Sequence, residues 1–214
     1  MHIAEGVLSA PVLITGAVVA AGAVAYGLKK LDPRQVMMAA ILGAAFFVAS
    51  LIHIPVGPSS VHLLLNGLLG VLLGWSAVPV IFVGLLLQAI LYGFGGLTVL
   101  GVNTATMGLG AVLSWYIFGG LLSVLKPLGA KKAAAVSGFV SGVAIAAILT
   151  ALALAFTDEG FKASALMLLA AHLPVMLIEG IVTAVAVSFI ARVRPALLPE
   201  ATRLKLADMI PPAE

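Results

Sequence analysis

The chain has 214 residues, of which 63% are hydrophobic and only 9% are charged, and its formal net charge is +3. Soluble domains carry about 25% charged residues, so this composition excludes a cytosolic enzyme, a disordered chain and a nucleic-acid-binding protein. The absence of cysteine excludes a disulfide scaffold, a thiolate metal site and a cysteine nucleophile. The sequence therefore predicts an integral membrane protein.

The first segment does not have the features of a secretory signal peptide. Residues 1–6 contain Glu5 but no Lys or Arg, whereas a signal peptide begins with a basic region. The apolar run that follows, residues 7–28, is long enough to span a hydrocarbon core of about 30 Å. We therefore expect the chain to begin at its own methionine and to keep this first helix.

Seven apolar runs follow one another along the chain, and each is longer than the 9–11 residues of a membrane β-strand. They predict an all-α integral membrane protein, a bundle of about seven transmembrane helices that forms one domain over residues 1–194. Residues 195–214, which are rich in proline and mixed charge, are expected to form a short cytoplasmic tail. The third run opens with a Gly-Pro-Ser-Ser turn and is short enough to cross only part of the bilayer. The runs are residues 7–28, 36–53, 60–74, 77–94, 104–125, 133–156 and 164–191.

Basic residues predict the orientation of the bundle. Ten of the 11 Lys and Arg residues follow the first, fifth and seventh runs, which lie on one side of the membrane if there are seven spans. The positive-inside rule places this side in the cytoplasm, so the C-terminus is expected to be cytoplasmic and the N-terminus outside. The ten residues are Lys29, Lys30, Arg34, Lys126, Lys131, Lys132, Arg192, Arg194, Arg203 and Lys205.

Small residues recur every four positions in the first run, at Ala17, Ala21 and Ala25. Such a stripe lets helices approach closely in lipid. It fits internal packing of the bundle or a docking face for a partner membrane subunit.

A histidine at the second position can form a chelate with the chain terminus. The amine of Met1 and the amide nitrogen and Nδ1 of His2 can bind one metal ion through fused five- and six-membered rings, once the amide has lost its proton. These three nitrogens are coplanar, which suits Cu(II) or Ni(II). The alternative is a frayed terminus in which the position of His2 has no function.

A fourth nitrogen would complete a square-planar set around the metal ion. It must come from the outer side of the membrane, because the N-terminus is expected there. His62, at the end of the 55–60 loop, and His53, at its other lip, are both candidates, and His172 lies in the outer third of the last run. A packing role for any of these histidines is the competing interpretation. Asn103, in an outer loop, is expected to orient an imidazole or the terminal segment.

Three other polar residues, Gln88, Asn66 and Glu179, are expected deeper in the bundle, where they would form interhelical hydrogen bonds. Because Glu179 follows His172 by seven residues, the two share one helix face, and an intramembrane enzyme that uses this pair is the weakest of three functional hypotheses. The sequence contains no G-x-S-x-G, H-E-x-x-H or P-loop motif. The chain therefore has no nucleotide motif with which to drive transport by itself.

Several motifs resemble those of a known family. Residues 1–9 (MHIAEGVLS) resemble the M-H-I-x-[DE]-G-x-L-[SP] start of the CbiM/NikM family, the substrate-capturing S components of energy-coupling-factor transporters for cobalt and nickel. Residues 56–62 (VGPSSVH), 94–98 (FGGLT) and 101–104 (GVNT) are similar to further family segments. The resemblance is good over the first five runs and rests mainly on hydropathy over the last two.

The resemblance implies seven helices, an extracellular N-terminus inserted into the bundle, and a near-planar site of four nitrogens. The donors would be the amine of Met1, the amide and imidazole of His2, and the imidazole of His62. His53 departs from the family pattern and is a candidate axial or transient ligand.

The family also implies a prokaryotic cell (inner) membrane, a membrane T component, two cytoplasmic ATPases and a small accessory membrane subunit. Ni²⁺ or Co²⁺ would be transported substrate, with no permanently bound cofactor. The alternative is an S component or carrier for an organic, vitamin-like substrate, with His2 incidental. A square of nitrogens favours Ni(II), but low-spin Co(II) also accepts it, so the sequence leaves the choice between them open.

Overall fold

The computed structural model describes residues 2–51, 53–56, 59–124, 132, 136–200 and 203, and it is mainly helical, as predicted. Short 3₁₀ turns lie at Pro33–Gln35, Gly74–Ser76, Glu159–Phe161 and Pro195–Leu197. The longer elements are α1 (Ala10–Lys30), α2 (Val36–Ala49), β1 (His53–Val56), β2 (Ser59–His62), α3 (Asn66–Leu73), α4 (Ala77–Tyr92), α5 (Leu100–Val124), the π-helix η4 (Gly138–Ile145), α7 (Ala146–Ala155) and α8 (Lys162–Val193).

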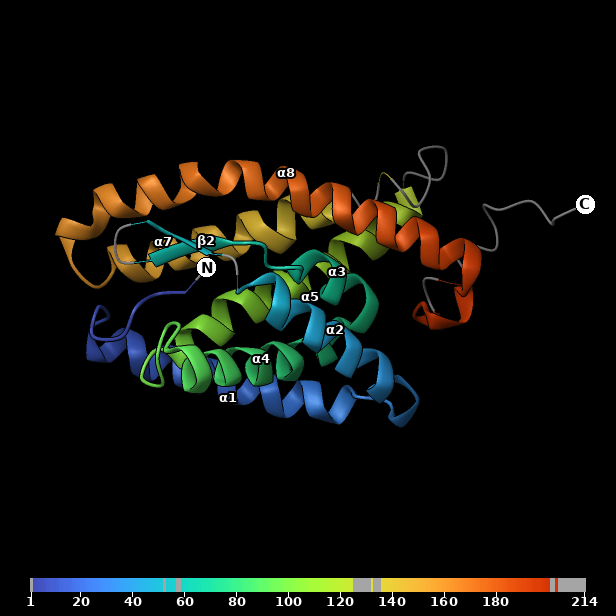
Figure 1. The fold of residues 1–214 in the computed structure, drawn as a ribbon, viewed down its shortest axis with the longest axis horizontal. Coiled ribbons are helices and arrows are strands. Elements are labelled where there is room, and N and C mark those ends of the chain that lie inside the picture. The colour runs from blue at the N-terminus through green and yellow to red at the C-terminus, as the bar shows by residue number, and fades with distance from the viewer. Residues whose placement is uncertain are drawn as a thin grey trace, which may run out of the picture.

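The helices run roughly along the long axis of the molecule (Figure 1). In that view α8 forms the upper edge with α7 below it, and α1 and α4 form the lower edge. Helix α5 contacts α1, α3, α4 and α7, so it is the central element of the bundle. The start of the described chain lies beside β2 (Figure 1), where Ile3 pairs with Ser59.

Four helical segments of the described chain are long and apolar enough to cross a membrane: Ala10–Lys30, Asn66–Tyr92, Leu100–Leu122 and Glu159–Val193. Two shorter apolar helices are Pro33–Ala49 and Gly142–Ala155. Large apolar side chains project outward along α8, where lipid would cover them. These exposed side chains include Leu166, Leu173, Leu177, Ile181, Val185 and Phe189. The helical membrane class is confirmed, whereas the number of seven spans and the orientation stay predictions.

The third predicted run differs from the structure. Residues 59–62 form strand β2, which pairs antiparallel with β1, and helix α3 starts only at Asn66. The second run is likewise too long as a helix, because α2 ends at Ala49 and β1 follows from His53. Buried apolar runs do not show by periodicity whether they are helix or strand, which is why the sequence did not predict the hairpin.

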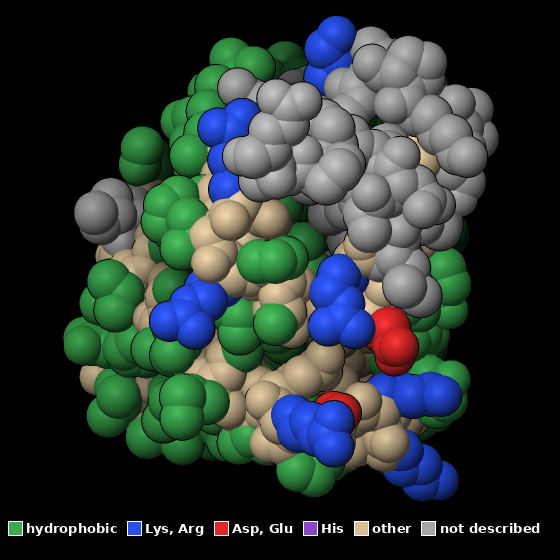
Figure 2. Space-filling model, turned by 90° about the vertical axis from the view of Figure 1, so that its right-hand side faces the viewer, with side chains coloured by type: hydrophobic (Ala, Val, Ile, Leu, Met, Phe, Trp, Pro, Cys, Tyr) green, Lys and Arg blue, Asp and Glu red, His purple; other side chains and the backbone are tan. Residues whose placement is uncertain are grey.

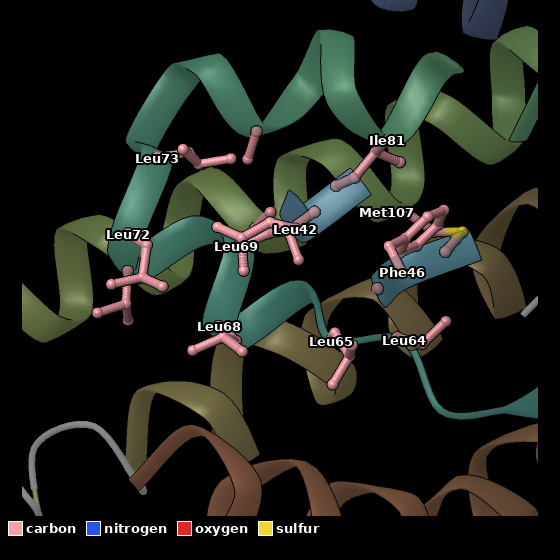
Figure 3. Packing of buried hydrophobic residues seen from close by; sticks show 14 of the residues in the cluster. Leu42, Phe46, Leu64, Leu65, Leu68, Leu69, Leu72, Leu73, Ile81 and Met107 are labelled. Atoms are coloured by element: carbon pink, nitrogen blue, oxygen red, sulfur yellow. The ribbon is translucent and has the colours of Figure 1, made fainter. Parts of the chain in front are cut away.

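Helix α3 lies in the centre of the protein, and all eight of its residues are buried. Leu64, Leu65 and the α3 leucines pack beside Phe46 of α2, Ile81 of α4 and Met107 of α5 (Figure 3). A Cβ on Gly70 would clash with the Ala111 carbonyl oxygen, so α3 and α5 are in main-chain contact there, as is common in lipid.

Basic side chains gather at one end of the molecule (Figure 2). Helix α1 ends with Lys29 and Lys30, and Arg192 lies in the last turn of α8. Lys132 is exposed, whereas Lys126, Lys131 and Lys205 lie outside the described residues, as does most of the predicted tail. The clusters after α1 and α8 therefore share one end, and the membrane side that this end faces remains a prediction.

Candidate metal centre

The N-terminal segment is held against the β-hairpin by main-chain and side-chain bonds. Ile3 forms an antiparallel bridge with Ser59. The carbonyl oxygen of His2 accepts hydrogen bonds from the Ser60 amide at 3.2 Å and from the Ser59 hydroxyl at 2.9 Å. Both His2 and Ile3 are buried. The start of the chain is therefore an integral part of the fold.

Asn103 was expected in an outer loop, but α5 begins at Leu100, so Asn103 lies in the first turn of this helix. From there it holds the same segment from another side. Its Oδ1 accepts from the Ile3 amide at 3.0 Å, and its Nδ2 donates to the Ile3 carbonyl at 3.4 Å. The loop after α4 closes over these bonds, since a Cβ on Gly95 would lie 2.9 Å from Asn103 Nδ2. The Glu5 carboxylate also accepts from the Thr98 amide at 3.3 Å. Asn103 thus orients the terminal main chain, which is one of the two roles expected of it.

Two imidazoles that are 60 residues apart in the chain meet at this place. Nδ1 of His2 lies 3.0 Å from Nε2 of His62. The ring centroids are 4.6 Å apart and the ring planes differ by 29°. Only 5% of His2 and 2% of His62 is exposed, so the pair is enclosed by protein.

The other nitrogen of each ring lies against an oxygen. His2 Nε2 is 2.7 Å from Gln88 Oε1, and His62 Nδ1 donates to the Leu63 carbonyl at 3.0 Å. His62 lies on β2, outside the long apolar helices, and burial lowers the pKa of its imidazole to about 4. A neutral imidazole keeps a lone pair for a metal ion.

The remaining predicted residues are placed as follows. Met1 lies outside the described residues. The main chain of His53 pairs with that of His62 across the hairpin, and its side chain lies outside what the structure describes. His172 is fully buried in α8, and its Nδ1 donates to the Leu168 carbonyl at 2.7 Å.

Glu179 and Asn66 are buried and form hydrogen bonds between segments of the bundle, as expected. One carboxyl oxygen of Glu179 accepts from the amides of Leu64, at 2.7 Å, and Leu65. It therefore takes up main-chain donors at the start of α3, which otherwise have no partner within the helix. Asn66 donates to the Gly142 carbonyl at 3.2 Å, linking α3 to the π-helix η4.

Two supporting residues were missed or misplaced by sequence reasoning. Gln88 was expected deeper in the bundle, but it contacts His2, because the terminal segment enters the bundle as far as α4. Ser50, at the end of α2, accepts from the Gln88 side-chain amide and was not considered. An isolated side-chain amide within the 77–94 apolar run is a signal in the sequence that could have indicated a supporting role for Gln88. A serine at the end of a helix is common and gives no such signal for Ser50.

Comparison with known proteins identifies the family. A family model for the cobalt uptake substrate-specific transmembrane region, CbiM, matches residues 2–197. The chain belongs to the CbiM family. A metal transport protein of Haemophilus influenzae is 37% identical, with 92% of this chain and 97% of that protein covered. The cobalt transport protein CbiM of Sorangium cellulosum is 34% identical, and the match covers 97% of this chain and 98% of that protein.

A solved structure agrees with this assignment. The crystal structure of a transition metal transporter superposes with a TM-score of 0.74 at 25% identity and covers 90% of this chain and 93% of that one. This CbiM-family chain is therefore a multi-pass membrane protein of cobalt and nickel transport.

Proposed function

We propose that this CbiM-family chain is the S component of an energy-coupling-factor importer for Ni²⁺ or Co²⁺. It would capture the ion through the amine of Met1, the amide and imidazole of His2, and the imidazole of His62. The contact between the two imidazoles carries the proposal, because it brings two metal-binding nitrogens from distant segments together inside the protein.

The spacing of the two nitrogens suits a shared ion. With metal–nitrogen bonds of about 2.0 Å, two donors at right angles lie about 2.8 Å apart. Nδ1 of His2 and Nε2 of His62 are 3.0 Å apart, so a metal ion would need only a small adjustment of the rings.

Main-chain donors would complete the set. Within the part of the chain that the structure describes, no group of three or more His, Cys, Asp or Glu side chains could hold a metal ion. Two imidazoles alone do not make a four-coordinate site, but the terminal amine and the His2 amide lie on the same short segment as the first imidazole. Burial of that segment between Asn103 and the hairpin supports their participation, since a buried segment is pre-organised for binding.

The chemistry of the donors favours the proposed ions. A planar set of four nitrogens suits d⁸ Ni(II) and is accepted by low-spin Co(II). Because Cu(II) binds such sites more tightly, selectivity would depend on the supply of metal and on the partner subunits.

The energy for import would come from other subunits. The sequence contains no P-loop lysine motif with which to bind nucleotide. We propose a membrane T component, two cytoplasmic ATPases and a small accessory membrane subunit as partners, with ATP hydrolysis on the ATPases driving the release of the ion inward.

The test is metal binding by the purified full chain, with its true terminus confirmed by mass spectrometry. One variant carries two leucines between Met1 and His2, which move the amine out of the fused rings. A single inserted residue would place the histidine third in the chain, where the amine, two amides and the imidazole can themselves bind Ni(II). A matched control carries two leucines between residues 203 and 204, in the tail. We expect the native chain and the control to bind Ni²⁺ and Co²⁺ and the first variant to lose binding. Equal binding by all three, or none, would reject the terminal chelate and favour an organic substrate.

A further inference from the structure

A pocket of about 270 Å³ lies far from the candidate metal centre, at the end of the molecule where the basic side chains gather (Figure 2). It is formed by the end of α1, the 3₁₀ turns at residues 33–35 and 74–76, the end of α3 and the second half of α5. Its volume is close to the lower limit of about 300 Å³ for small-molecule sites, so it suits a small polar group. The polar and aromatic side chains that line it are Tyr26, Lys30, Gln35, Trp75, Trp115 and Tyr116.

Contacts between aromatic rings hold this pocket in shape. The ring of Trp75 meets that of Tyr26 edge-on, with centroids 4.7 Å apart and planes at 81°. Trp75 Nε1 donates to the Tyr116 hydroxyl at 3.1 Å, and the Tyr116 ring lies 4.7 Å from that of Trp115. A Cβ on Gly74, where φ is +56°, would lie 3.3 Å from the Trp115 ring, so this ring rests on the main chain. The pocket is therefore formed before any ligand binds.

The polar groups of the lining are mainly hydrogen-bond donors. Lys30 has an ammonium group and Trp115 an indole N–H, and neither forms a hydrogen bond or ion pair within the part of the chain that the structure describes. The Tyr116 hydroxyl accepts from Trp75, so its own hydrogen is left to donate, and Gln35 adds a side-chain amide. The described lining contains no Asp or Glu. Positive charge and unused donors in one pocket favour an anion.

The position of the pocket along α1 indicates the source of this anion. Helix α1 has 21 residues and is therefore about 31 Å long, close to the hydrocarbon thickness of about 30 Å. Lys30, its last residue, thus lies at the level of the lipid headgroups. Along its length α1 exposes Ile14, Val18 and Leu28, against which acyl chains would pack. A phospholipid that lies along α1 would place its phosphate beside Lys30.

The charges around the pocket also suit an anionic headgroup. Lys29 precedes Lys30 in the last turn of α1, and Arg192 lies in the last turn of α8 at the same end. The carboxylate of Asp32 accepts from the Arg34 amide at 2.8 Å and does not line the pocket. Basic pockets between membrane helices are typical sites for anionic headgroups.

We propose that this pocket binds the phosphate headgroup of an anionic phospholipid, with Lys30 as the charged contact and the Trp115 N–H and Tyr116 O–H as further donors. The inference goes beyond the proposed function and does not depend on it. Trp and Tyr are common at both membrane interfaces, and an aromatic belt without a headgroup site would show no preference between anionic and zwitterionic lipids. Selectivity for the anionic lipid is therefore the property to test.

The chain carries its own reporter, because its two tryptophans, Trp75 and Trp115, both line the pocket. The purified full chain in an uncharged detergent is titrated with dioctanoyl phosphatidylglycerol, dioctanoyl phosphatidylcholine or inorganic phosphate, and tryptophan fluorescence is recorded. We expect a saturable change with phosphatidylglycerol and none with the other two over the same concentrations. Equal changes with both lipids, or no saturable change, would overturn the proposal. An equal change with inorganic phosphate would show a site for free phosphate and would refute the lipid assignment.

Variants at two exposed lysines test the charged contact without removing either tryptophan. Lys30→Gln should bind phosphatidylglycerol about 5–10-fold more weakly, as expected for the loss of one basic contact to an anionic lipid, and Lys30→Arg should retain the affinity. Lys162→Gln is the matched control, because Lys162 is also exposed but pairs with Glu159, outside the pocket. It should bind like the native chain. Equal affinities of Lys30→Gln and Lys162→Gln would refute the site.

Discussion

Replacing Gly95 by alanine should damage the site through the terminal segment. Gly95 has a left-handed backbone, with φ of +76°, which is unfavourable for a residue with a Cβ by about 1–2 kcal/mol. The added Cβ would also lie 2.9 Å from Asn103 Nδ2 and 3.6 Å from the Cβ of His2. The first of these distances is too short, so Asn103 has to move.

The displaced Asn103 side chain makes two bonds to the main chain of Ile3. Each contributes about 0.5–1.5 kcal/mol, so Gly95→Ala should lower the free energy of unfolding by about 2–5 kcal/mol in total. Gly93 provides a matched control, because its φ is also left-handed, at +67°, but a Cβ there meets nothing within 4 Å. Gly93→Ala should therefore show only the backbone effect of about 1–2 kcal/mol.

The assay combines unfolding in mixed detergent micelles with Ni²⁺ titration of the folded proteins. Gly95→Ala should bind Ni²⁺ about 10–100-fold more weakly, as for the loss of other groups that orient ligands, whereas Gly93→Ala should bind like the native chain. If both variants lose stability and affinity to the same extent, the loop does not act through Asn103, and the reasoning is refuted.

Three further predictions concern other parts of the chain. His62→Ala removes a proposed ligand and should weaken Ni²⁺ binding by more than about 100-fold, which exceeds the usual effect of losing a group that only orients a ligand. His53→Ala should weaken binding less in the same titration. If His53→Ala has the larger effect, the roles of the two histidines are exchanged. Glu179→Leu leaves two buried main-chain amides without an acceptor and should lower the free energy of unfolding by about 2–6 kcal/mol. Glu179→Gln keeps an acceptor oxygen and should lower it by less when both variants are unfolded by denaturant. An equal loss of unfolding free energy in the two variants would contradict this account. Because the chain has no cysteine, the single-cysteine variants Lys30→Cys and Glu159→Cys report the orientation of the protein in the membrane. A membrane-impermeant maleimide added to intact cells should label only Glu159→Cys. Labelling of Lys30→Cys alone would show that the orientation is the reverse of the predicted one.

The helical class could be predicted from composition and the length of the apolar runs, because both follow from the thickness of the bilayer. The terminal chelate could also be proposed, since its three donors lie on two adjacent residues and need no tertiary information. The β-hairpin could not be predicted, because strand pairing between residues 53–56 and 59–62 depends on what covers them. The choice of His62 over His53 came only from the resemblance to the family.

The residues that contact the terminal segment were harder to predict than the proposed ligands, whose role stays a prediction. Asn103 could be proposed because it lies in a short polar stretch between apolar runs. Gln88 lies in α4 and bonds Ser50, which caps α2. The contact of Gln88 with His2 exists only when the terminal segment is inside the bundle. No local pattern in the sequence encodes this insertion.

Glu179 shows how a distant helix affects the same site. It accepts from the amides of Leu64 and Leu65, directly after the strand that carries His62. Leu65 has a left-handed φ of 54°, which is unfavourable for leucine, and the bonds to the buried carboxyl group offset this strain. Helix α8 thus determines where β2 ends and α3 begins, and with it the position of His62. The proposed ligands lie on two short segments, but the distance between them depends on α2, α4, α5 and α8 together, so the candidate site forms only in the assembled bundle.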